Sequence, residues 1–106
     1  MEDPKIVLIV GVSCEDPARE RELNAWYDNV HLPEVCRAPG VKRASRYEIV
    51  ERSEGYPDCL TIYELETDDG LQKYETYRQE QSQGKAPRFT PGPPLKVIWR
   101  RAYKEV

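Results

Sequence analysis

The sequence predicts an α+β fold with the element order β-α-β-β-α-β, and three observations support this prediction. Residues 5–12 and 95–103 form apolar runs rich in β-branched and aromatic side chains, which is typical of strands. Residues 41–52 alternate in polarity and are joined by a turn at 53–57 to a further strand at 59–65. Two segments with helical spacing separate these strands. The order predicts a four-stranded antiparallel sheet with both helices on one face, the ferredoxin-like arrangement.

The first strand and first helix have clear local signals. Residues 5–12 are apolar on both faces, which predicts a central strand. Asp16 is placed to cap the following helix, and Pro17 suits its first position. Pro33 is expected to end or kink this helix. Spacings of three and four define its apolar stripe, formed by Leu23, Trp26, Tyr27 and Val30.

The second half of the chain predicts one more helix, a loop and a last strand. Residues 67–69 are expected to cap a helix that carries Leu71, Tyr74 and Tyr77. The proline-rich stretch 86–94 must be loop. In the last strand, Leu95, Val97 and Trp99 are expected on one face. The first and last strands are therefore apolar on both sides, and a homodimer that pairs two sheets is the simplest cover for the face without helices.

Composition limits the class of protein. The 106 residues suit one domain, residues 1–106, and the net charge of −3 gives no electrostatic case for nucleic acid or anionic membranes. The acidic start and the short first apolar run do not suit a signal peptide or a membrane span. Three cysteines without metal-ligand spacing predict neither a zinc site nor disulfides. We therefore expect a cytoplasmic protein that binds no metal.

His31 is the only histidine and the first candidate for catalysis. Its side chain titrates near neutrality and is a natural proton carrier. Asp28 and Glu34 lie three residues away on the same helix, so either carboxylate could orient the imidazole, while Tyr27 is one turn earlier. The alternative is that His31 only caps the helix end near Pro33, where the helix dipole favours a cation.

Further candidates would bind the substrate. Asn24 could stabilise an oxyanion or be an exposed polar residue, and Trp26 could line a pocket, although helix periodicity favours a core role. Tyr27 could donate to a substrate carbonyl. Tyr47 and Tyr63 lie in predicted strands, where cavity lining competes with ordinary cross-strand packing. Glu34 is the remaining candidate for substrate binding.

The segment Glu22-Leu-Asn-Ala-Trp-Tyr-Asp-Asn-Val-His-Leu-Pro-Glu34, with Pro39-Gly40-Val41 and Arg46-Tyr47, resembles the dimeric α/β-barrel superfamily. It is most similar to EthD-like and REDY-like (HapK-type) small proteins. The resemblance covers nearly the whole chain. It implies two sheets that form a barrel across a homodimer, with one cavity per subunit between sheet and helices. It also implies that no metal or organic cofactor is needed, since enzymes of this superfamily mostly act without one.

Three functions follow as hypotheses. The first is a cofactor-independent enzyme of secondary metabolism, in which His31 transfers a proton to or from a polyketide-like or aromatic small molecule. Cyclase, dehydratase, isomerase and hydrolase reactions all fit it. The second is a cofactor-free monooxygenase of the antibiotic-biosynthesis type, distinguished by oxygen consumption with a quinol. The third is a non-catalytic dimeric protein that holds a hydrophobic metabolite, distinguished by retained ligand without turnover.

Overall fold

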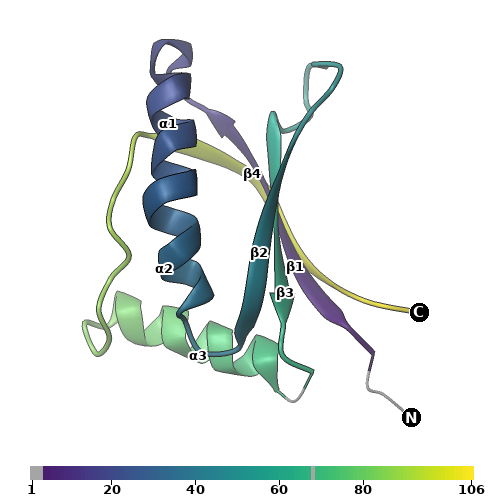
Figure 1. Ribbon diagram of the computed structural model, residues 1–106, viewed down its shortest axis with the longest axis vertical. Helices are drawn as coiled ribbons and strands as arrows, with labels where there is room; N and C mark the ends of the chain where they lie inside the picture. Colours follow the sequence, from purple (N-terminus) through teal and green to yellow (C-terminus); the bar gives the residue numbers. More distant parts are fainter. Residues whose placement is uncertain (1–3, 68) are drawn as a thin grey trace.

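The computed structural model describes residues 4–67 and 69–106. Its strands are β1 (Ile6–Cys14), β2 (Val41–Glu48), β3 (Cys59–Leu65) and β4 (Leu95–Lys104). A long helical segment follows β1, and helix α3 (Gly70–Ser82) follows β3. Both helical segments lie on the same side of the sheet (Figure 1). The predicted ferredoxin-like α+β fold, with a four-stranded antiparallel sheet, is confirmed.

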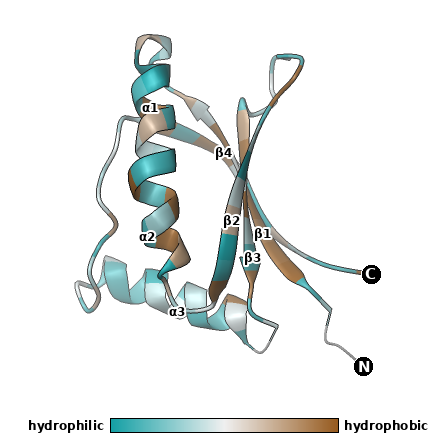
Figure 2. Cartoon of the chain, viewed as in Figure 1, coloured by the Kyte–Doolittle hydropathy of each residue, from teal (hydrophilic) through white to brown (hydrophobic). Residues whose placement is uncertain are grey.

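The sheet has the strand order β2-β3-β1-β4, so the apolar β1 is a central strand as predicted. Figure 2 shows β1 coloured as hydrophobic over much of its length, whereas the edge strand β2 is mostly hydrophilic. The main core lies between the sheet and the helices, where Leu8, Val35, Tyr63 and Leu65 are buried. No helix in the described part of the chain is both long and apolar enough to cross a membrane.

An irregularity in β4 changes which of its side chains share a face. In β4, Val97 pairs with Val12 and Trp99 pairs with Gly11, so Ile98 is an extra residue at a bulge. Because a bulge reverses the alternation, Val97 lies on the helix side and Trp99 on the opposite side. The prediction that Leu95, Val97 and Trp99 share one face is therefore wrong.

The first helix continues beyond Pro33 and contains an unusual turn. A short 3-10 turn (Pro17–Arg19), with the side chain of Asp16 accepting from the Ala18 amide as its cap, leads into α1 (Glu20–Trp26). A π-helical segment (Tyr27–His31), labelled η2 below, then leads into α2 (Leu32–Cys36). The amide of Leu32 bonds to the carbonyl of Tyr27, five residues back. This wider turn accommodates Pro33, so the expected helix end lies after Cys36 instead.

The cap position of helix α3 is occupied by Asp69, one of the three residues predicted to cap it. Its backbone lies in the left-handed region, with φ of 59°, and its side chain makes no capping hydrogen bond. Aspartate tolerates this conformation better than most other residues do. Asp68, also expected in the cap, lies outside the described residues. Tyr74 is buried and Leu71 and Tyr77 pack on the core, as predicted from their spacing.

Candidate functional site

A chamber of about 220 Å³ lies between the sheet and the helices. Its walls combine apolar strand residues with aromatic and cationic side chains, a composition typical of small-molecule sites. Val10, Val12, Leu95 and Val97 form the apolar part on β1 and β4. The polar and aromatic part is formed by Trp26, Tyr27, His31, Tyr63, Tyr74, Arg78, Phe89 and Arg100. Its volume suits a compact ligand of roughly one or two rings.

His31 is enclosed by three aromatic rings. Its imidazole stacks on Trp26 with ring centres 4.6 Å apart and an interplanar angle of 17°. Tyr27 and Phe89 meet it edge-on, at 5.3 Å and 5.5 Å. The Nδ1 atom is buried and has no hydrogen-bond partner among the described residues. A buried polar atom without a partner is costly, which makes it a natural contact for a bound polar ligand.

Burial keeps His31 neutral at physiological pH. Desolvation disfavours the imidazolium, and the nearby Arg78 guanidinium disfavours it further, so the pKa of His31 falls from 6.5 to about 4. Glu34 acts in the opposite direction but more weakly. Burial also raises the pKa of Tyr27 and of Tyr63, so both phenols stay protonated and able to donate a hydrogen bond.

Two arginines that sequence reasoning missed give the chamber its positive charge. Arg100 forms an ion pair with Glu75, which offsets part of its charge. The Arg78 guanidinium donates to the amide oxygen of Gln81, and no carboxylate lies within 4 Å of it among residues 4–67 and 69–106. The one available signal was that Arg78 follows Tyr74 by one helical turn. Arg78 should therefore attract an anionic group more strongly than Arg100 does.

The expected carboxylate partner of His31 is absent from the described structure, so the predicted orienting hydrogen bond is wrong. Asp28 is largely exposed and forms an ion pair with Arg46 at 3.6 Å. The carboxylate of Glu34 accepts hydrogen bonds from the Thr90 amide, at 2.9 Å, and from the Thr90 hydroxyl, at 3.0 Å. Among the described residues, neither carboxylate orients the imidazole, which packs against the rings of Trp26, Tyr27 and Phe89.

Besides Glu34, two further predicted substrate-binding residues lie outside the chamber lining. The side-chain oxygen of Asn24 accepts a hydrogen bond from Arg46 at 2.9 Å. Arg46 in turn lies over the Tyr27 ring, 4.4 Å from its centre, so Asn24 supports the back of the site. Tyr47 is 57% exposed and lies on the sheet face away from the helices. Trp26, Tyr27, His31 and Tyr63 are the predicted residues that the fold brings together.

The proline-rich loop after α3 closes one side of the chamber. The Trp26 indole donates to the carbonyl of Thr90 at 3.1 Å, and Phe89 packs on His31. Gly92 approaches the Trp26 ring so closely that a Cβ there would lie 2.3 Å from it. Sequence reasoning placed this loop correctly but missed Phe89, the only phenylalanine in the chain. A lone aromatic residue within a proline-rich loop was the available signal.

Comparison with solved structures shows the fold. The chain is similar to HapK from Hahella chejuensis (TM-score 0.62, 12% identity, covering 95% of this chain and 92% of that one). It is also similar to a putative monooxygenase from Shewanella loihica PV-4 (TM-score 0.62, 10% identity, covering 100% of this chain and 98% of that one). A third similar structure is a dimeric ferredoxin-like protein of unknown function from Thermobifida fusca YX (TM-score 0.54, 15% identity, covering 98% of this chain and 92% of that one). No family model and no curated protein matches the sequence.

Proposed function

We propose that this protein binds an aromatic or polyketide-like small molecule in the chamber and transfers a proton at His31 without a cofactor. The observation that carries the proposal is a neutral, desolvated imidazole whose buried Nδ1 has no partner among the described residues, in a chamber that also holds Arg78. An unprotonated imidazole can accept a proton, and a guanidinium can hold the anion that results.

The proposed chemistry is enolisation. A carbon next to a carbonyl loses a proton to an imidazole nitrogen, and the electron pair moves onto the carbonyl oxygen. Arg78 and the protonated phenol of Tyr27 stabilise that enolate oxygen. The negative charge forms beside the new imidazolium, which raises the pKa of His31 at the moment when it must hold the proton. Cyclisation, dehydration and isomerisation can all proceed from such an enolate.

The second candidate is a cofactor-free monooxygenase. It is favoured by one geometric feature, the electron-rich Trp26 indole stacked on His31 inside the chamber, and by the name of the similar Shewanella loihica structure. The two functions share the deprotonation step and differ in the fate of the carbanion. Oxygen consumption during turnover of a quinol assigns the chain to the monooxygenase class.

The state of His31 can be measured directly, because its ring signals are the only histidine signals in the protein. We expect an NMR titration to give a pKa of about 4 in the free protein. Saturation with hydroxynaphthoate, an aromatic acid, should raise this pKa because the bound anion offsets Arg78. In Arg78→Gln the free protein should titrate higher and respond less to the ligand. An ordinary pKa near 6.5 would place the ring in water and contradict the proposal.

The same pKa predicts how stability depends on pH. Since the folded-state pKa of His31 is lowered, the unfolded chain binds a proton at this residue between about pH 6.5 and pH 4 that the folded protein does not. The free energy of unfolding should therefore fall as the pH falls through this window. Urea unfolding at several pH values should show a smaller fall in His31→Gln, which cannot take up this proton.

The proposal includes a homodimer formed through the sheet face without helices. Val7, Ile9, Leu60, Ile62 and Trp99 lie on this face and are only half-buried in the single chain. A face of this character is typical of an interface. The name of the similar Thermobifida fusca protein, which calls it dimeric, supports the same arrangement.

Replacing Ile62 with glutamate should dissociate this dimer, because the substitution places a charge at the centre of an apolar contact. Light scattering should then give a monomer mass, with circular dichroism unchanged. Val50→Glu carries the same new charge on a side chain that is 97% exposed, and it should leave the dimer intact. A monomeric wild-type protein, or a folded Ile62→Glu protein that remains dimeric, would contradict this interface.

A further inference from the structure

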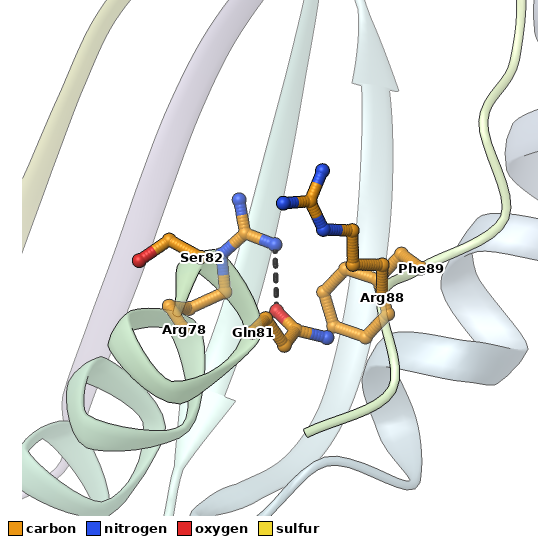
Figure 3. Close-up of a pocket in the computed structure, with 5 residues that line it drawn as sticks. All are labelled: Arg78, Gln81, Ser82, Arg88 and Phe89. Carbon is orange, nitrogen blue, oxygen red and sulfur yellow. Dashed lines mark hydrogen bonds between the residues drawn. The ribbon is translucent and has the colours of Figure 1, made fainter. Parts of the chain in front are cut away.

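A second cavity, of about 320 Å³, adjoins the chamber and is lined by Arg78, Gln81, Ser82, Arg88 and Phe89. We call it the arginine cleft. Helix α3 supplies the first three of these residues, and the following loop supplies Arg88 and Phe89 (Figure 3). Arg78 and Phe89 also line the chamber, so the two spaces meet at these side chains.

The cleft is built around a buried amide. Gln81 is 3% exposed, and its nitrogen donates to the carbonyl of Pro87 at 2.8 Å, which ties the loop to the helix. Its oxygen accepts from the Arg78 guanidinium at 3.0 Å. Phe89 lies under the same guanidinium, 5.1 Å from its central carbon. These contacts fix the position of Arg78 between the cleft and the chamber.

No carboxylate in the described part of the chain forms an ion pair with the two arginines of the cleft. Arg78 and Arg88 have no carboxylate within 4 Å among residues 4–67 and 69–106, although the protein as a whole carries a net charge of −3. Figure 3 shows the two guanidinium groups extending to the same side, above Gln81. Guanidinium groups that line one cleft can both be stabilised by a bound oxyanion, to which arginine donates paired hydrogen bonds.

From this arrangement we infer that the substrate carries an oxyanion group, a carboxylate or a phosphate, outside the rings held in the chamber, and that Arg78 and Arg88 bind it in the arginine cleft. The inference rests on the proposed function. It restricts the substrate to molecules that have an aromatic or polyketide-like body and an acidic tail. The tail would occupy the arginine cleft, which meets the chamber at Arg78 and Phe89. It would hold the body in one orientation, with the same carbon always presented to the imidazole.

The first experiment tests anion binding in the cleft alone. Inorganic phosphate and acetate are titrated separately at constant ionic strength, and backbone amide signals are followed by NMR. We expect saturable shifts at residues 78–82 and 88–89, and the anion that binds more tightly identifies the group. Arg88→Gln should weaken binding about tenfold, and Arg88→Lys should weaken it less. Arg21→Gln, the same charge change on an exposed residue of α1 outside the cleft, should leave binding unchanged.

The second experiment separates this inference from the proposed function. Naphthylbutanoate and its neutral amide are compared, with the His31 ring signals reporting occupation of the chamber. We expect the acid to bind about tenfold more tightly than the amide, and Arg88→Gln to remove this preference.

Equal binding of acid and amide, or unsaturable phosphate and acetate shifts, would overturn the inference and leave the chamber proposal standing. Saturable anion binding in the cleft, with no naphthalene compound shifting the His31 signals, would support the anion site and overturn the proposed function of the chamber.

Discussion

His31→Gln should slow enolisation of a bound ketone about a hundredfold or more, because it removes the proposed proton acceptor from the chamber. Beta-tetralone, a compact bicyclic ketone, is a suitable probe in deuterium oxide. NMR then follows replacement of its acidic protons by deuterium as a function of protein concentration. Glutamine keeps a planar polar group against Trp26 but cannot accept a proton near neutral pH, so the loss should appear in the exchange rate with little change in stability.

A control in the same π-helical segment is Asn29→Ala, which alters an exposed side chain outside the chamber lining. Its exchange rate should stay within about twofold of wild type. The pH profile gives a further check, because exchange should fall as the pH drops toward the pKa of His31, near 4. Equal exchange rates for wild type and His31→Gln would exclude His31 as the proton acceptor for this probe.

The largest effect on stability is expected for Gly40→Ala. Gly40 has φ of 86°, and a Cβ there would lie 2.2 Å from the carbonyl oxygen of Gly70, at the start of α3. The Gly40 carbonyl also accepts from the Glu66 amide at 2.8 Å, so the turn cannot move freely. Backbone strain and the clash together should lower the free energy of unfolding by about 3 kcal/mol or more, measured by urea denaturation.

Gly55→Ala is the matched control for the clash. Gly55 has nearly the same backbone angle, φ of 87°, but nothing lies within 4 Å of a Cβ added there. Only the cost of the left-handed conformation applies, about 1 kcal/mol. If both variants lost the same free energy of unfolding, the close contact between Gly40 and Gly70 would not be what holds β2 against α3.

The Pro39-Gly40-Val41 motif illustrates how much a local pattern can predict. In the sequence it contributes to the family resemblance and lies between the first predicted helix and the strand at 41–52. The structure adds that Gly40 contacts the start of α3, some thirty residues later in the chain. The motif therefore serves the packing of distant elements, which no local pattern contains.

The candidate site divides in the same way. The helical spacing of Trp26, Tyr27 and His31 was sufficient to group them, because residues one turn apart share a helix face. The partners of Asp28 and Glu34 could not be predicted, since Arg46 and Thr90 come from a strand and a loop that the fold brings beside the helix.

By itself the sequence determined the order of the strands and helices, the central place of β1 and the helix that carries His31. These features depend on periodicity and on turn residues, which act over a few neighbouring positions. Only the tertiary structure decided that Trp99 turns away from the chamber at the Ile98 bulge, and that Arg78, Arg88 and Phe89 surround one cleft. Such groupings depend on how distant elements pack and on a one-residue shift in strand register, because that shift moves a side chain to the other face of the sheet.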